Sequence, residues 1–463
     1  MASLENTDLV ERSLAPRLSY EAPLTSALLL VLAGAVVIGG IVLQNYYVLA
    51  ALPLLILATK YPVEMSLGLF AFLIPFDNVL LLGKGYSIDW ALGAAAGAIL
   101  LAYGLVTGRL RTPPRSALWW GLFIAWGAET LLWALDPAQG LQRLPSAVSI
   151  FVFYLVVVSF RMNPRELRTV VLFIIAGGVL ASAVALRDFT RGVGWLSRAA
   201  LTVANNQTNP NDFADTLLFP FSLALGGFLS AATLMKRSAM LLGATLIGVC
   251  VLLTMSRGSL FGLATLLIVY LIRLRVRRQI LIPIVLVSAF ITVAPSFFFQ
   301  RMQQALTDRG DGRWDIFLVG VQIVKHYPIL GVGLDNFHMG YAKFAGFAPI
   351  FRGFDRDPHN IYLQVWAELG IVGLALFLTA IIWQLRELHL ANRGRRGSPN
   401  FLLLAIEAAC WALLVHGFAA NLLWRKQFWL VWILAALATQ LQRPSETAER
   451  EWSPALIGSD ARA

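Results

Sequence analysis

Long apolar runs separated by short polar breaks are the feature that most constrains the fold of this chain. The runs are about 15 to 23 residues long, which is the length that crosses a lipid bilayer as an α-helix. Of the 463 residues, 58% are hydrophobic and only 14% are charged, whereas soluble domains carry about 25% charged residues. The sequence therefore predicts an all-α, polytopic membrane helix bundle.

About fourteen apolar spans can be placed along the chain, and the number falls to about twelve if two short spans are re-entrant or merged. The predicted spans cover residues 24–43, 46–59, 62–82, 88–106, 116–135, 144–160, 168–186, 213–235, 238–254, 258–272, 279–297, 361–384, 400–423 and 427–441. We therefore expect about 12 to 14 transmembrane helices.

Basic residues alternate between the two sides of this predicted bundle. With the N-terminus inside the cell, the arginine-rich loops at Arg109–Arg115 and Arg273–Arg278 face the cytoplasm, and the short outside loops are poorer in basic residues. This is the positive-inside pattern, and it explains the net charge of +11 without a nucleic-acid partner. Residues 1–23 then form a cytoplasmic N-terminal tail, and the polar segment 442–463 forms a disordered cytoplasmic tail.

A polar stretch of about sixty residues, 298–360, interrupts the spans and is far longer than an ordinary connection. It separates a transmembrane bundle over 24–297 from C-terminal transmembrane helices over 361–441. Apolar residues at near-helical spacing predict an amphipathic helix over 314–326, which ends before Pro328. Because long loops on a rigid scaffold often carry binding and catalytic residues, we predict one large extracytoplasmic catalytic loop with short helices.

Two arginines on the outer side are in positions that suit an anion. Arg257 stands at the mouth of a span, where its planar guanidinium needs a partner such as phosphate; the alternative is a side chain that reaches lipid headgroups. Arg313 follows Gly312 at the start of the amphipathic helix, where a flexible glycine and exposed helix N–H groups favour an anion. The alternative for Arg313 is a surface charge near Asp311 and Asp315.

The large loop also carries three of the five histidines of the chain. His359 directly precedes a predicted span and could act as a general base near neutral pH, although an exposed loop histidine would give the same pattern. His338 is a weaker candidate, and His326 is expected to support packing. We assign no catalytic role to His389, on the cytoplasmic side, or to His416, within a span.

Two other polar clusters fit less specific interpretations. The asparagine-rich segment Asn205–Asn211 could bind a sugar, but capping of the following helix is the favoured interpretation. The pairs Asp308/Asp311 and Asp355/Asp357 lie near arginines, where ion pairs are commoner than a metal site. The sequence contains no P-loop, dinucleotide fingerprint, zinc-ligand spacing or serine-nucleophile elbow. We therefore predict neither a metal nor a cofactor.

Five motifs follow one another in a recognisable order: NPNDFA at 209–214, SRGS at 256–259, GRWDIF at 312–317, PILGVGLDNF at 328–337 and HNIYLQVWAELGIVG at 359–373. Together they resemble the O-antigen ligase and O-antigen polymerase superfamily of bacterial membrane glycosyltransferases. The resemblance covers about the second half of the chain and the many-span layout. Its most specific part runs from Pro328 to Gly373.

The resemblance implies inverting, metal-independent transfer of a glycan from an undecaprenyl-diphosphate-linked donor to an acceptor hydroxyl, at the periplasmic face of the bacterial inner membrane. By motif position, Arg257 and Arg313 resemble the diphosphate-binding arginines, and His359 resembles the essential histidine of the large loop. The physical chemistry agrees, because the attacking hydroxyl needs a base and the leaving diphosphate gathers charge that arginines can stabilise. The supporting candidates are Arg198, Asn209, Asp335, His338 and Asn360.

Several functions remain open at this stage. We favour an O-antigen ligase that transfers glycan to lipid A-core, over an O-antigen or exopolysaccharide polymerase and over a protein O-oligosaccharyltransferase. The expected partners are the lipid-linked glycan, an acceptor glycolipid or glycan, and membrane lipids. A transporter of the lipid-linked glycan is the alternative from another class; it predicts ionisable residues at mid-membrane and discontinuous helices. The polar groups of this sequence concentrate at one face, which favours an enzyme.

Overall fold

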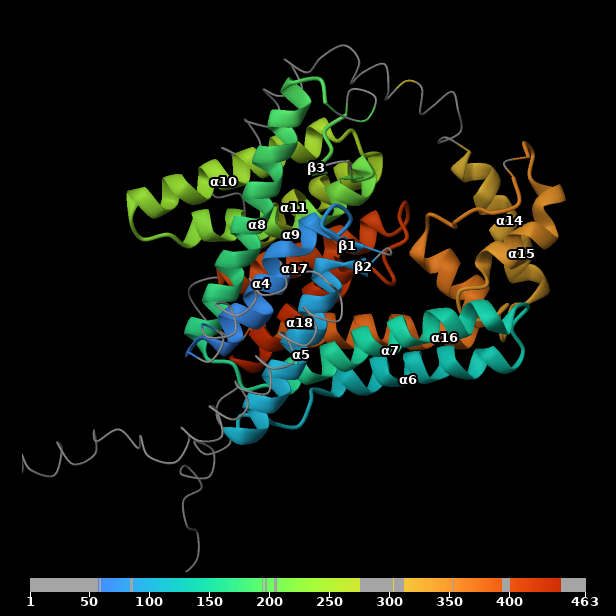
Figure 1. The fold of residues 1–463 in the computed structure, drawn as a ribbon, viewed down its shortest axis with the longest axis horizontal. Coiled ribbons are helices and arrows are strands. Elements are labelled where there is room, and N and C mark those ends of the chain that lie inside the picture. The colour runs from blue at the N-terminus through green and yellow to red at the C-terminus, as the bar shows by residue number, and fades with distance from the viewer. Residues whose placement is uncertain are drawn as a thin grey trace, which may run out of the picture.

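The computed structural model describes residues 57, 60–83, 86–193, 195, 198–203, 206–274, 303, 312–351, 353–393 and 400–442. The predicted spans at 24–43 and 279–297, most of the span at 46–59, the N-terminal tail, and all but the first residue of the C-terminal tail lie outside these residues. The described part of the chain is almost entirely helical (Figure 1).

The first half of the described chain contains η2 (Glu64–Gly68), α4 (Leu69–Leu73), η3 (Ile74–Phe76), α5 (Ile88–Val106), α6 (Arg115–Glu129), η4 (Thr130–Leu132), α7 (Pro137–Ser159), α8 (Pro164–Thr190) and α9 (Pro210–Ser230). The second half contains α10 (Leu234–Leu253), α11 (Arg257–Leu274), α14 (Arg313–His326), α15 (Phe337–Phe344), η6 (Ala345–Phe347), α16 (Ile361–Arg393), α17 (Phe401–His416) and α18 (Lys426–Gln440). Two short antiparallel hairpins pair β1 (Leu81–Gly83) with β2 (Tyr86–Ser87) and β3 (Thr202–Val203) with β4 (Asn206–Gln207).

Within the described residues, six helices are long and apolar enough to cross a membrane. They are α7, α8, α9, α10, α11 and α16. Shorter apolar helices cover Glu64–Phe76, Trp90–Val106 and Phe401–His416. The predicted class, an all-α polytopic membrane bundle, is therefore confirmed. The total of about 12 to 14 spans stays a prediction, because some of these spans lie outside the described residues.

Several helices begin earlier than the apolar pattern predicts, because polar caps and prolines extend their first turns. Asn209 caps α9, accepting a hydrogen bond from the backbone N–H of Asn211 at 2.9 Å, and Pro210 occupies the first helical position. Asp136 caps α7 in the same way, with Pro137 following. A proline is suited to this position because its missing N–H would have no partner there. A prediction from hydropathy alone places the start of a helix where the apolar run begins.

The helix α9 lies at the centre of the bundle. It packs against α8, α10, α11 and α17, and almost all of its side chains are buried. The start of α9, with Asn209 as its cap and Asp212 in its first turn, is therefore held in a fixed position at one end of the packed helices. This rigid placement matters because polar residues of α9 help to build the site described below.

The predicted amphipathic helix is present as α14, and it begins one residue earlier than predicted. Figure 1 shows α14 and α15 together at one end of the adjacent helices α6, α7 and α16. Ile316, Val319 and Ile323 of α14 pack with Phe337 and Tyr341 of α15 in a small separate core that also includes residues of α16. The apolar face of α14 thus caps the bundle.

The helix α16 is interrupted at Gly370, which has φ 67° and ψ −172°, whereas the sequence predicted a continuous span. The loop at 328–333 fills the break. Its Val332 N–H donates to the carbonyl of Ala367 at 2.9 Å, and the N–H of Ile371 donates to the carbonyl of Pro328 at 2.9 Å. Backbone groups freed by the break are thereby satisfied. The part of α16 after the break is itself long enough to cross a bilayer.

Substituting Gly370 by alanine is expected to destabilise the protein by about 3 kcal/mol or more. The backbone conformation at Gly370 is one that only glycine adopts readily, and an added Cβ would lie 1.9 Å from the carbonyl oxygen of Ile329. Thermal unfolding in detergent measures this effect. Gly346→Ala is the matched control, because no atom lies within 4 Å of its Cβ position. Equal melting temperatures for the two variants would contradict the packing at the break.

Candidate functional site

A small polar cavity lies where several helix ends meet. It has a volume of about 140 Å³, below the range of about 300–1,000 Å³ that is usual for whole ligands. It therefore suits a small polar group, with the rest of a larger substrate outside. The cavity is lined by Asn209, Asn211, Asp212, Asp215, Arg313, Asp357, His359, His416, Ala419, Ala420, Asn421 and Arg425.

Two of the three principal candidates from the sequence, Arg313 and His359, line this cavity together. Arg313 is the first residue of α14 and follows Gly312, whose φ of 80° turns the chain into the helix. One Nη of Arg313 donates to the carbonyl of Ala419 at 2.8 Å, which holds the guanidinium at the cavity wall. The arginine thus projects from a helix start, where the helix dipole adds to its attraction for an anion.

His359 precedes α16 and has a positive φ of 46°, which is uncommon for a residue other than glycine. The next residue, Asn360, fixes this geometry. Its side-chain oxygen accepts hydrogen bonds from the backbone N–H groups of Tyr362 and Leu363, both at 3.0 Å. Asn360 therefore caps the helix, and this cap sets the direction in which the chain enters at His359.

The surroundings of His359 favour the neutral form of its imidazole. Burial is the main cause that lowers the pKa of His359 below the ordinary value of 6.5, and the positive charges of Arg313 and Arg356 lower it further. The negative charge of Asp357 opposes this effect. A neutral imidazole is the form that can accept a proton, so the environment favours a base.

The third principal candidate, Arg257, lies next to the cavity but is not one of its lining residues. It is the half-buried first residue of α11. The following residue, Gly258, packs against the cavity wall: a Cβ on Gly258 would lie 2.7 Å from His416 Nδ1 and 3.0 Å from the Cβ of Ala419. The structure thus places the backbone at Arg257 beside the cavity that contains Arg313.

Arg198 supports the turn before Arg257. The side chain is buried, and its Nε donates to the carbonyl of Thr254 at 2.7 Å. Its Nη2 donates to Asn211 Oδ1 at 2.6 Å. Arg198 therefore joins the turn before α11 to the first turn of α9. Asn209 has the capping role favoured from the sequence, and it also lines the cavity.

Two supporting candidates lie elsewhere in the structure. Asp335 forms an ion pair with Arg143 at 3.0 Å, and its backbone N–H donates to the side chain of Glu368. His338 lies on α15. Neither residue lines the cavity. Asp335 belongs to the motif PILGVGLDNF, whose residues 328–333 fill the break in α16.

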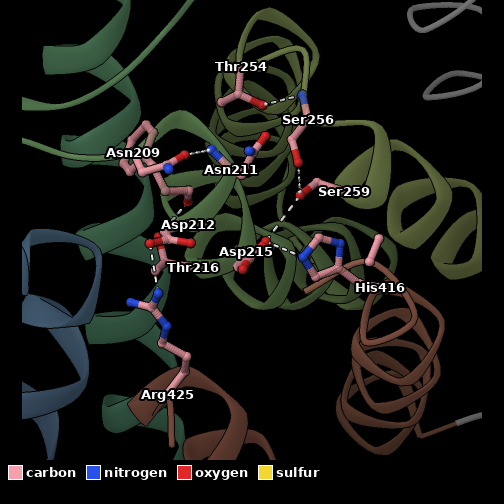
Figure 2. A network of polar contacts seen from close by, with 12 residues as sticks. Asn209, Asn211, Asp212, Asp215, Thr216, Thr254, Ser256, Ser259, His416 and Arg425 are labelled. Carbon is pink, nitrogen blue, oxygen red and sulfur yellow. Dashed lines mark hydrogen bonds and ion pairs between the residues drawn. The ribbon is translucent and has the colours of Figure 1, made fainter. Parts of the chain in front are cut away.

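The cavity also contains ionisable residues that the sequence interpretation did not select. His416, which was set aside as a span residue, forms an ion pair with Asp215, and both side chains are almost fully buried. Figure 2 shows this pair together with Ser259, whose hydroxyl donates to Asp215 at 3.3 Å and lies 3.0 Å from the hydroxyl of Ser256. The sequence did contain a signal for these residues, namely an ionisable side chain inside an apolar helix. Placing such a side chain in a membrane is energetically costly, and residues of this kind are usually functional.

A second ion pair at the cavity joins the starts of α9 and α18. Arg425 Nη2 donates to Asp212 Oδ2 at 2.8 Å (Figure 2), and about a third of each side chain is exposed. Asp212 belongs to the motif NPNDFA, whereas Arg425 belongs to none of the five motifs. The sequence did not indicate a role for Arg425, because this residue is far along the chain from Asp212.

No group of three or more metal-capable side chains occurs among the residues that the structure describes. Of the two aspartate pairs considered from the sequence, Asp308 and Asp311 lie outside those residues, and Asp357 lines the cavity beside His359. The absence of a metal stays a prediction.

Comparison with known proteins identifies one family. A family model described as O-antigen ligase matches residues 242–378. No curated protein matches the chain. The matched range includes Arg257, Arg313 and His359, together with the break in α16 at Gly370 and the loop that fills it. Residues 242–378 are therefore similar to the O-antigen ligase family, and the chain is a multi-pass membrane protein.

Proposed function

We propose that this protein is an inverting, metal-independent glycosyltransferase that transfers a glycan from an undecaprenyl-diphosphate donor to an acceptor hydroxyl. The proposed location of the reaction is the periplasmic face of the bacterial inner membrane, and the proposed activity is that of an O-antigen ligase, which uses lipid A-core as acceptor. The observation that carries the proposal is the shared cavity of Arg313 and His359, both within the family-matched region.

The reaction is a single displacement at the anomeric carbon. His359 accepts the proton of the acceptor hydroxyl while that oxygen forms a bond to the anomeric carbon. The bond between the anomeric carbon and the phosphate oxygen breaks, and its electron pair leaves with the diphosphate. Because the nucleophile attacks from the face opposite the leaving group, the configuration inverts. No acid is needed, since a diphosphate leaves without protonation.

The arginines stabilise the charge that develops on the leaving diphosphate. Arg313 stands in the cavity wall and is held by the carbonyl of Ala419. Arg257, beside the same wall, is proposed to hold the diphosphate from the neighbouring helix start. Fixed cations of this kind need no reorganisation as charge develops, which is why they can replace a metal ion.

The fall of kcat/KM at acid pH is expected to reflect the protonation of His359. Because its pKa lies below 6.5, kcat/KM should fall only as the pH drops below that value. Asp357→Asn removes a charge that favours the protonated form, so this limb should move to lower pH. Arg356→Gln removes a charge that disfavours it, so the limb should move to higher pH. Profiles of the two variants that move in the same direction, or coincide with wild type, would contradict the assignment.

Deletion of the gene, followed by analysis of surface glycans, tests the activity and its subclass. Full-length glycan that accumulates on its lipid carrier is the result expected for a ligase. Unpolymerised repeats would indicate a polymerase instead, and normal lipopolysaccharide with unglycosylated proteins would indicate a protein O-oligosaccharyltransferase. Purified protein should also transfer glycan in the presence of EDTA, and loss of activity there would contradict the metal-independent mechanism.

A transporter of the lipid-linked glycan is the second candidate, and two features favour it. The helix α16 is broken at Gly370, and Asp215 forms a buried ion pair with His416. The enzyme remains the better account, because the break is filled by backbone of the loop 328–333 and the ion pair borders the cavity of His359. Translocation of fluorescent lipid-linked glycan in liposomes without any acceptor would support the transporter.

A further inference from the structure

Asp212, Asn421 and Arg425 are polar residues of the cavity that the proposed chemistry does not use. They come from the first turn of α9, the loop between α17 and α18, and the residue before α18. All three lie outside the family-matched residues 242–378. Their role therefore needs an argument separate from that for the diphosphate and the base.

The ion pair between Asp212 and Arg425 leaves hydrogen-bonding capacity for a ligand. It is joined by one hydrogen bond of 2.8 Å, and about a third of each side chain is exposed. A carboxylate accepts several hydrogen bonds and a guanidinium has five N–H donors, so a single mutual bond leaves most of this capacity for a ligand. The backbone N–H of Arg425 is fixed by the carbonyl of Leu422 at 3.0 Å, which keeps the pair in place at the cavity.

Asn421 adds an acceptor whose hydrogen-bonding capacity is unused. Its side-chain oxygen is buried and has no hydrogen-bond partner in the part of the chain that the structure describes, and the residue lines the cavity. Burying an amide oxygen without a donor is unfavourable. A ligand O–H or N–H placed in the cavity would remove this penalty.

The hydrogen-bond acceptor oxygens of Asp212 and Asn421 indicate the chemical class of the ligand. An ionised diphosphate offers only acceptor oxygens, so it would be repelled by Asp212 and could donate nothing to the oxygen of Asn421. Sugar hydroxyl groups both donate and accept, and they match a carboxylate, a guanidinium and an amide oxygen grouped in one place. The volume of about 140 Å³ fits part of one sugar ring and excludes a whole oligosaccharide.

We propose that Asp212, Asn421 and Arg425 form a subsite for the hydroxyl groups of one sugar ring beside the reacting bond. This inference rests on the proposed glycosyl transfer. The ring comes either from the donor, next to its diphosphate, or from the acceptor. In both cases the subsite adds binding energy that the diphosphate residues Arg257 and Arg313 do not supply.

The test compares two lipids on the full-length protein in nanodiscs: undecaprenyl diphosphate without sugar, and the lipid-linked glycan that accumulates in the deletion strain. For Asn421→Ala, Asp212→Asn and Arg425→Gln, binding of the bare lipid should stay within about twofold of wild type. Binding of the glycan-carrying lipid should weaken about tenfold, as expected for the loss of a buried hydrogen bond. If the ring belongs to the acceptor, both lipids bind normally and the acceptor KM rises about tenfold.

Gln207→Ala is the matched control, because Gln207 is an amide residue that does not line the cavity. If Asp212→Asn or Arg425→Gln fails to fold, Asn421→Ala still tests the proposal, because it removes only one side-chain amide from a loop. Unchanged glycan-lipid affinity with unchanged acceptor KM overturns the subsite, and so does an equal loss for both lipids. Failure of the wild type to bind either lipid would instead contradict the proposed function, and Arg313→Ala should weaken both lipids alike.

Discussion

Replacing His359 by alanine is expected to lower the rate of glycan transfer by about 10²–10⁴-fold, the usual contribution of a positioned general base. Donor binding should stay close to that of wild type, because the imidazole acts on the acceptor hydroxyl. The neutral form of His359 is favoured by burial and by Arg313, and its direction is set by the cap at Asn360. Alanine has no group that can accept the proton.

Single-turnover transfer by purified protein, with donor binding measured separately, checks this expectation. His338→Ala is the matched control, because His338 belongs to the same large loop but does not line the cavity. Its rate should stay within about twofold of wild type, as is usual for residues away from the reacting groups. A His359→Ala rate within about tenfold of wild type would contradict the role of the base.

Replacing Arg313 by alanine is expected to reduce kcat by about 10²–10³-fold, comparable to the loss of one oxyanion-stabilising donor. The guanidinium stands at a helix start in the cavity wall, where it can oppose the charge of the leaving diphosphate. Arg313→Lys should recover only part of the rate, because an ammonium keeps the charge but lacks the planar fork that binds two phosphate oxygens.

The same transfer assay, with a donor titration, separates binding from turnover. Arg191→Ala is the matched control, because Arg191 is an exposed arginine just after α8 and lies outside the cavity. Full recovery of the rate by Arg313→Lys would show that charge alone is sufficient, which disagrees with a bidentate contact. Unchanged kinetics for both Arg313→Ala and Arg257→Ala would remove the arginines from the mechanism.

The sequence predicted the helices whose signals are local. Apolar spacing was sufficient to place α14 almost to the residue, because the packed face of an amphipathic helix repeats along its own segment. The order of the motifs led to the prediction that Arg313 and His359 act at one site, although a long stretch of sequence separates them. The structure places both residues at one cavity. Arg257 was predicted with equal weight, yet its side chain is not one of the cavity's lining residues.

What the sequence could not supply depends on contacts between distant segments. Gly370 stands in an apolar run, so hydropathy predicts a continuous helix there, and only the bonds to the loop 328–333 explain the break. The ion pairs that join α9 to His416 and Arg425 likewise connect segments that are far apart in the sequence. Each of these residues alone looked like an ordinary span or loop residue.

The most direct test of the central claim is an experimental structure of the protein in a nanodisc with undecaprenyl diphosphate bound. The account predicts that the diphosphate binds against Arg313 in the cavity wall, with its oxygens about 2.7–2.9 Å from the guanidinium, and that His359 faces the position of the acceptor hydroxyl. A diphosphate bound on the cytoplasmic side, or outside the cavity that Arg313 and His359 share, would contradict the account.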